Sequence, residues 1–289
     1  DFAFMDAAVG AVGIAFCHTV FNVFTTIILL PFSRQLEQLA RRVVRSENAG
    51  EQFAFLDPLL LRTPGVAISE SVTMTNRMGQ LAHETLLLAL EQLSGWSEER
   101  EAQILQNEDK LDIYEDRISN YLVEVSQHGV SMDDIRTVSR LLHAVGDFER
   151  IGDHALNIQD SARELHDKDR CFSGDAEEER SVVIEALQDI LECAVHCFQA
   201  DDPAAAGEVE PLEEAIDHLI ESIRDRHIRR LQSGHCTIQL GFVLNDLLTN
   251  FERVSDHCSN IAVSVIQEQG GGLDSHTYLH TVKTGSSFD

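Results

Sequence analysis

The chain has 289 residues, enough for one large domain or two modest ones with hydrophobic cores. It carries 49 Asp and Glu residues against 22 Lys and Arg residues, and its formal net charge is −27. Nucleic-acid binding needs basic surfaces that replace counterions, so this balance argues against nucleic acid as a partner. Aromatic residues are few, and the dominance of Ala, Leu, Glu, Arg and Gln favours helices.

The first feature in chain order is an uncharged apolar run at residues 7–32. Its length of about 26 residues allows a helix to span a hydrocarbon core of about 30 Å. The alternatives are a signal peptide, which would be shorter and would follow a basic flank, and a buried core helix. We predict a transmembrane helix within residues 1–33. Because residue 1 is Asp rather than Met, we expect a fragment or a processed chain.

The segment after this run is basic. It contains four arginines close together: Arg34, Arg41, Arg42 and Arg45. Positive charge next to a membrane helix marks the cytoplasmic side, so we predict localisation in the cell membrane with residues 34–289 in the cytoplasm. Residues 34–68 include proline and glycine breaks and are predicted to be a juxtamembrane connector.

From residue 69 onward the apolar pattern is helical almost throughout, and no strand is predicted. Breaks at glycine, proline and highly charged segments divide it into predicted helices at residues 69–95, 98–127, 131–166, 179–200, 203–233 and 236–268. We therefore predict an all-α fold in which one N-terminal transmembrane helix precedes a helical bundle. The Gly-, Ser- and Thr-rich tail, residues 269–289, is predicted to be disordered.

The bundle is predicted to contain two copies of one unit. The segment FERIGDHALNI at residues 148–158 returns as FERVSDHCSNI at residues 251–261. Upstream, NEDKLDIYEDRI at residues 107–118 aligns with LEEAIDHLIESI at residues 212–223. Self-similarity on this scale indicates a structural repeat. We predict two tandem three-helix repeats, repeat 1 at residues 69–167 and repeat 2 at residues 179–268.

Acidic residues recur at equivalent positions of the two repeats. They are Glu149, Asp153, Glu108 and Asp112 in repeat 1, and Glu252, Asp256, Glu213 and Asp217 in repeat 2. Residues four apart share a helix face, and a helical projection places these carboxylates along the flank of each apolar stripe. If the helices are neighbours, several carboxylates converge, which is costly unless cations neutralise them. We predict sites for divalent or trivalent metal ions: iron, manganese, magnesium or zinc.

The alternative to metal binding is a solvated acidic rim whose carboxylates form weak surface ion pairs. A single Glu-x-x-x-Asp pair would favour that alternative, but its recurrence in both repeats favours metal binding. His154 and His257 follow the second acid of each motif but project to another side of the helix, so we expect polar surface residues there. The six cysteines are expected to be reduced thiols. Cys193 and Cys197 could hold a metal ion, although packing as small buried side chains is favoured.

Motifs for catalysis are absent from the sequence. It contains no arrangement for a nucleophile, no Gly-rich phosphate loop, no dinucleotide-binding fingerprint and no zinc-protease motif. The chain is therefore predicted not to be an enzyme and to have no catalytic residues.

The tandem repeats with the motif Glu-Arg-x-x-Asp-His-x-x-Asn-Ile resemble the PhoU family over about residues 69–267. The resemblance implies a helical, pseudo-symmetric protein that binds metal clusters through its acidic motifs and regulates phosphate uptake. It assigns these motifs to Glu149 and Asp153 and to Glu252 and Asp256.

A second resemblance concerns the N-terminal part. HTVFNVFTTIILLPF at residues 18–32 and LDPLLLRTPGVAISE at residues 56–70 are similar to bacterial sodium-dependent phosphate cotransporters. In that family the last membrane helix leads into a cytoplasmic PhoU-like domain. The chain has neither the preceding membrane helices nor the Gln-Ser-Ser-Ser motif of the family. The resemblance implies that residues 1–33 contain the final transmembrane helix of a transporter core. That core, with its unknown substrate-binding residues, is therefore expected upstream of this chain or is missing.

These resemblances lead to a main functional hypothesis and two alternatives. The main hypothesis is the C-terminal portion of a sodium-dependent inorganic phosphate symporter, with the PhoU-like domain as a metal-binding regulatory module. Its partners would be the membrane, the upstream transporter core and, through that core, sodium and phosphate, and a homo-oligomer is left open. The first alternative is a membrane-anchored PhoU-type adaptor that regulates phosphate uptake or signalling through a separate transporter or sensor kinase. The second is a purely structural bundle that binds no metal.

Overall fold

The structure is a computed structural model that describes residues 11–29 and 56–269. The chain divides into two compact units, residues 1–53 and 54–289. All regular secondary structure within the described residues is helical, which confirms the predicted all-α class for this part of the chain.

The first unit contributes one described helix, α1 (Ala11–Leu29). Its 19 residues extend about 28 Å at 1.5 Å per residue, and Phe16, Phe21 and Phe24 are exposed on it. Among the helices that the structure describes, none is both long enough and apolar enough to cross a membrane. The predicted transmembrane helix therefore gains no support from the structure. Both ends of the predicted run at residues 7–32 lie outside the described residues.

The second unit begins with a short 3-10 helix, η2 (Pro58–Arg62), and then the three long helices of repeat 1. These are α4 (Pro64–Gln92), α5 (Glu98–Ser126) and α6 (Met132–Asp167). We expected a connector up to residue 68, but α4 already starts at Pro64. Proline is compatible with the first turn of a helix because the N–H it lacks would have no partner there. The predicted connector at residues 34–55 and the predicted tail at residues 270–289 lie outside the described residues.

Repeat 2 contains three long helices and one short one. They are α7 (Gly174–Ala200), α8 (Pro203–Ala206), α9 (Val209–Gln232) and α10 (Ile238–Gln269). The single helix predicted at residues 203–233 is therefore wrong. The Asp202 carboxylate accepts hydrogen bonds from the N–H groups of Ala204 and Ala205 and caps a separate four-residue helix, and α9 starts only at Val209.

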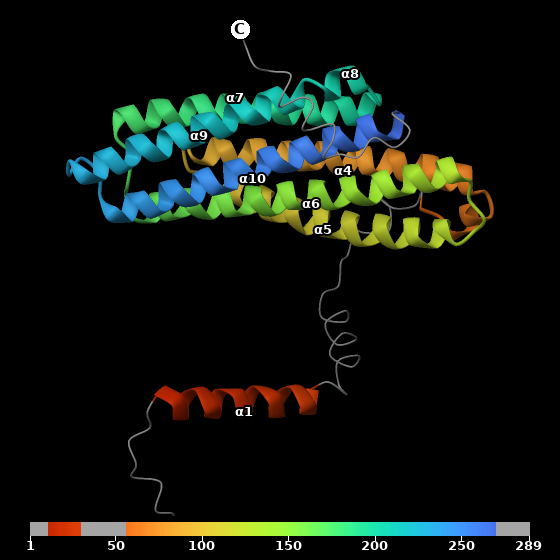
Figure 1. Cartoon of the computed structure of the whole chain (residues 1–289), viewed down its shortest axis with the longest axis horizontal. Helices are drawn as coiled ribbons and strands as arrows, with labels where there is room; N and C mark the ends of the chain where they lie inside the picture. Colours follow the sequence, from red (N-terminus) through yellow and green to blue (C-terminus); the bar gives the residue numbers. More distant parts are fainter. Residues whose placement is uncertain (1–10, 30–55, 270–289) are drawn as a thin grey trace, which may run out of the picture. The chain divides into compact units, whose positions relative to one another are not determined.

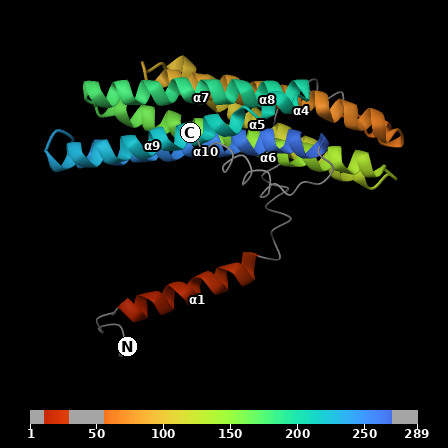
Figure 2. The same ribbon diagram turned by 45° about the horizontal axis from the view of Figure 1, so that its top comes forward.

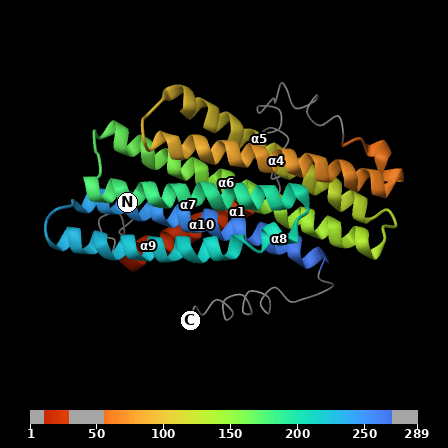
Figure 3. The ribbon, with the colours of Figure 1, turned by 90° about the horizontal axis from the view of Figure 1, so that it is seen from above.

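The long helices of each repeat pack against one another, and α6 packs against α10. In repeat 2, α10 contacts both α7 and α9. Figure 1 shows α6 and α10 side by side and running in opposite directions. A second contact joins α4 and α7, which lie together in Figure 2. Seen from above, α5 and α9 occupy opposite sides of the bundle (Figure 3). The repeats thus meet through α4, α6, α7 and α10.

The repeated phenylalanines lie in the core of this arrangement. Phe148 of α6 and Phe251 of α10 are fully buried. The Phe148 ring meets the Phe198 ring edge-on with a centroid distance of 5.4 Å. It also lies close to the backbone of Gly79, where an added Cβ would be 2.8 Å from the Phe148 Cζ atom. The Phe-Glu-Arg motif therefore anchors α6 and α10 by its first residue and leaves its acidic residue at the edge of the core.

Candidate functional site

The four predicted carboxylates of repeat 1 are neighbours in the structure. Glu108 and Asp112 lie on α5, and Glu149 and Asp153 lie on α6, which packs against α5. Asp112 is exposed and the other three are half-buried. They form the repeat 1 carboxylate row.

Burial and charge interactions within this row raise the pKa values of three of its members. Burial, followed by the charge of Asp112, raises the pKa of Glu108. Burial, followed by the charge of Asp153, raises the pKa of Asp112 and of Glu149. A nearby cation is Arg150, whose side chain lies 3.4 Å from Glu149 and 3.0 Å from Asp153. It is largely exposed and only partly offsets the repulsion at Glu149.

The equivalent carboxylates of repeat 2 are in a different electrostatic environment. A guanidinium nitrogen of Arg224 in α9 lies 2.8 Å from a carboxylate oxygen of Glu252 in α10. The aligned position in α5 is Ser119, which carries no charge. Asp256 pairs with Arg253 at 3.1 Å. In repeat 2, an arginine from the neighbouring helix α9 thus lies next to the acidic motif of α10.

The two remaining predicted residues of repeat 2 lie on α9. Glu213 is buried and Asp217 is exposed. One turn before Glu213, the buried Glu210 accepts a hydrogen bond of 2.7 Å from the Ser259 hydroxyl of α10. Sequence reasoning did not identify Glu210, because its aligned position in repeat 1 is the apolar Leu105.

Carboxylates with raised pKa values fit a hard cation, because a cation would relieve their mutual repulsion. Within the described residues, however, no group of three or more His, Cys, Asp and Glu side chains is arranged so that it could hold a metal ion. Metal binding by these residues therefore stays a prediction.

The expected surface position of His154 and His257 is wrong. Both are half-buried where α6 meets α10, and their ring centroids are 5.6 Å apart. His154 Nδ1 lies 2.9 Å from Asn250 Oδ1, and His257 Nδ1 lies 2.9 Å from Asp147 Oδ1. Burial lowers the pKa of His154, and the hydrogen bond with Asn250, which acts in the opposite direction, only partly offsets this effect. A projection of one isolated helix identifies the face that packs within a repeat and cannot show a contact between repeats.

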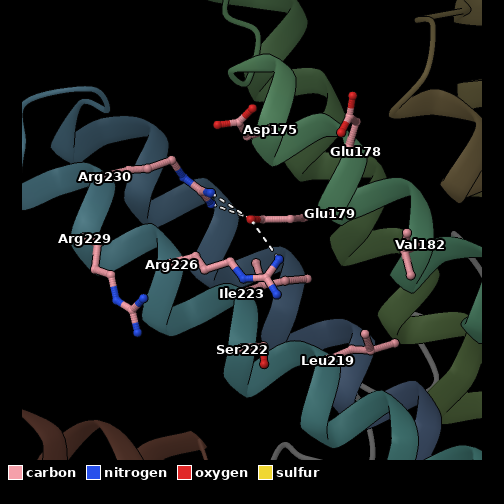
Figure 4. A pocket seen from close by; sticks show the side chains of 10 residues that line it. All are labelled: Asp175, Glu178, Glu179, Val182, Leu219, Ser222, Ile223, Arg226, Arg229 and Arg230. Atoms are coloured by element: carbon pink, nitrogen blue, oxygen red, sulfur yellow. Dashed lines mark hydrogen bonds and ion pairs between the residues drawn. The ribbon is translucent and has the colours of Figure 1, made fainter.

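A cavity of about 600 Å³ lies between α7 and α9 (Figure 4). Its lining combines acidic, basic and apolar side chains: Asp175, Glu178, Glu179, Val182, Leu219, Ser222, Ile223, Arg226, Arg229 and Arg230. Glu179 accepts hydrogen bonds from Arg230 at 2.7 and 2.9 Å and from Arg226 at 3.4 Å. Burial alone would raise the pKa of Glu179, but these two arginines outweigh it and lower the pKa. The hydrogen bonds of Glu179 with Arg226 and Arg230 thus connect α7 to α9.

Two of the six cysteines fit the packing interpretation, whereas Cys193, the other member of the predicted pair, is half-buried. Cys197 and Cys258 are buried thiols, and burial raises the pKa of Cys197 to about 12. Burial likewise raises the pKa of Cys258. Protonated, buried thiols are poor metal ligands, because the thiolate is the form that coordinates.

Fold and site together define a class: a helical protein of two tandem repeats with an acidic motif in each. The model of the PhoU domain matches residues 75–162 and 182–265, one match in each repeat. The chain belongs to the PhoU domain family.

Curated relatives and solved structures agree with this assignment. The "phosphate-specific transport system accessory protein PhoU homolog 1" of Thermotoga maritima is 24% identical over 219 residues, which cover 73% of this chain and 90% of the relative. A PhoU homolog of Zymomonas mobilis is 26% identical over 191 residues, 65% of this chain and 78% of the relative. The fold matches the crystal structure of PhoU from Pseudomonas aeruginosa with a TM-score of 0.67 and 22% identity, over 71% of this chain and 99% of that one. The regulatory protein PhoU from Streptococcus pneumoniae gives a TM-score of 0.65 and 18% identity, over 73% and 99%.

Proposed function

We propose that the chain is a PhoU-type accessory protein that regulates phosphate transport and acts through a separate transport system. The observation that carries this proposal is the match of the PhoU domain to both repeats. The relatives support it, because their names describe accessory proteins of a phosphate-specific transport system and this chain covers most of their length. The role is regulatory rather than enzymatic.

This proposal favours the adaptor over the symporter portion. The relatives described above are named as accessory proteins of a phosphate-specific transport system and not as transporters. We also propose that the chain is located at the membrane and is anchored there by residues 1–33. The support for this part is the apolar run at residues 7–32 and the arginines that follow it.

Affinity purification of the full-length protein from detergent-solubilised membranes tests the adaptor role. We expect subunits of a phosphate transport system to be enriched over a control purification of an unrelated tagged helical protein. Recovery of the chain as one continuous polypeptide with a sodium/phosphate transport core would instead support the symporter. Recovery of the chain alone would contradict both hypotheses.

We further propose that the repeat 1 carboxylate row binds a hard metal ion such as iron, manganese or magnesium. Glu149 and Asp153 of α6 would hold it together with Glu108 and Asp112 of α5. The support for this site is that burial and mutual repulsion together raise the pKa values of Glu108, Asp112 and Glu149. The metal would neutralise this charge and fasten α5 to α6. In repeat 2, Glu213, Asp217, Glu252 and Asp256 are expected to bind more weakly, because Arg224 already pairs with Glu252.

Elemental mass spectrometry on the full chain, purified without chelator, tests this site. The Glu149→Gln/Asp153→Asn variant is expected to lose its metal, and the Glu252→Gln/Asp256→Asn variant to lose less. Asp160→Asn/Glu164→Gln is the matched control, since these exposed acids have the same spacing on the same helix. Equal metal content in all four proteins would contradict the assignment.

A further inference from the structure

Two histidines from different repeats lie next to each other where α6 crosses α10. The ring centroids of His154 and His257 are 5.6 Å apart, and the ring planes are tilted by 30°. The same motif position supplies both, so the pair follows from the sequence repeat. The carboxylate row does not include them, and the proposed regulatory function does not use them.

The hydrogen bonds of the Nδ1 atoms determine the tautomer of each ring. The Asp147 carboxylate can only accept, so His257 Nδ1 carries the hydrogen that it donates across 2.9 Å. The Asn250 amide donates its own Nδ2 hydrogen to the Asp246 carbonyl oxygen at 2.8 Å, which directs its Oδ1 toward His154. His154 Nδ1 is therefore also a donor. Each neutral ring then has its lone pair on Nε2.

Both Nε2 atoms are available to a ligand. Neither has a hydrogen-bond partner within the described part of the chain, and neither belongs to the buried nitrogen atoms that lack a partner there. Histidines that bind metals commonly donate their other ring N–H to a carboxylate or carbonyl oxygen, which fixes the ring orientation. Asp147 and Asn250 provide that support from the opposite repeat, and Asn260 Nδ2 also donates to Asp147 at 3.3 Å.

The separation of the rings suits a shared ion. Two imidazoles bound to one tetrahedral Zn²⁺ through bonds of about 2.0–2.1 Å have ring centroids about 5 to 5.5 Å apart. We propose that His154 and His257 form a two-histidine site for a borderline divalent transition metal such as Zn²⁺ or Ni²⁺, which links the two repeats. Water or a ligand from outside would complete the coordination.

This site differs chemically from the carboxylate row. Imidazole nitrogen prefers zinc, nickel and copper, whereas carboxylate oxygen suits magnesium and manganese. The two sites can therefore be tested separately. A Glu149→Gln/Asp153→Asn/Glu252→Gln/Asp256→Asn background removes the contribution of both acidic motifs, so failure of one proposal does not obscure the other.

The test is isothermal titration calorimetry with Zn²⁺ on the full-length protein that carries these background substitutions. The key variants are His154→Asn and His257→Asn, because the asparagine amide can keep the hydrogen bond made by Nδ1 while removing Nε2. We expect each to weaken Zn²⁺ binding at least about tenfold, with Mg²⁺ giving no signal in any protein. His143→Gln is the control, since His143 is an exposed residue of the same helix.

The thermal unfolding temperature provides a second measurement. Because the ligands come from different repeats, Zn²⁺ is expected to raise this temperature in the background protein and in the His143→Gln control, and to leave it unchanged in both asparagine variants. Far-UV circular dichroism establishes that each variant is folded before titration. Undetectable Zn²⁺ binding by the background protein, or equal binding by the asparagine variants, would overturn the proposal.

Discussion

At the scale of single residues, the repeat 1 carboxylate row holds charge that the fold tolerates at a cost. The pKa of Glu149 is raised by burial and by Asp153, so the folded state binds a proton at this carboxyl more tightly than the unfolded state does. Stability is therefore lost as the pH rises from the ordinary glutamate range through the raised pKa. At neutral pH the ionised row opposes folding unless a cation is bound.

The substitution Glu149→Gln removes one of these charges without changing the size of the side chain. In metal-free protein at pH 7 we expect the free energy of unfolding to increase by about 0.5 kcal/mol, the scale of a like-charge pair four residues apart. Urea unfolding with a chelator measures it. The control Glu164→Gln should change stability in the opposite direction, since Glu164 pairs with Lys168 at 2.6 Å. A loss of stability in Glu149→Gln at pH 7 would show that the row is not under strain.

At the scale of elements, helix existence could be predicted and helix packing could not. The capping box of Ser131 and Asp134 starts α6 within one residue of the predicted position, because caps and apolar spacing are local signals. The early start of α4 at Pro64 and the separate helix α8 were missed, since proline and glycine breaks allow more than one local conformation. The contact of α6 with α10 depends on residues about a hundred positions apart, which periodicity does not report.

Close contact between α4 and α6 depends on the absence of a side chain at Gly79. Gly79→Ala would place a Cβ 2.8 Å from the Phe148 ring in the core, and we expect a loss of about 1–3 kcal/mol. Gly146→Ala is the matched control, because nothing lies within 4 Å of an added Cβ there. In a helix interior it should gain about 0.5–1 kcal/mol. Thermal unfolding of both variants checks this, and equal effects would mean that α4 and α6 can separate to make room.

The attachment of α7 to α9 depends on Glu179, whose carboxylate is almost buried between Arg226 and Arg230. Glu179→Gln should cost about 1–2 kcal/mol, because charge-assisted hydrogen bonds are lost and Arg230 keeps a largely buried charge. The pKa of Glu179 is lowered, so its contribution is present above the ordinary glutamate value and is lost as the pH falls through the lowered pKa. Urea unfolding from pH 7 to 3 should show the wild type and the variant converging. A constant difference would contradict this assignment.

At the scale of the whole molecule, the sequence predicted the tandem repeats and the repeat 1 residues that lie together. It did not predict the unequal environments of the two acidic motifs, because Arg224 lies on a different helix from Glu252 and no spacing rule joins them. The same limit applies to the histidine pair, whose partners come from the opposite repeat. Repetition in the sequence therefore indicated a symmetric fold. Differences at single aligned positions, such as Arg224 and Ser119, make the two repeats chemically different.

The most direct test of the regulatory role is the uptake of radiolabelled phosphate by cells that lack the chain. These cells would be complemented with the wild type, with Glu149→Gln/Asp153→Asn, or with the Asp160→Asn/Glu164→Gln control. We predict that the wild type and the control restore the difference in uptake between phosphate-starved and phosphate-replete cells, and that the carboxylate-row variant does not. Identical regulation of uptake with and without the chain would contradict a role in phosphate transport.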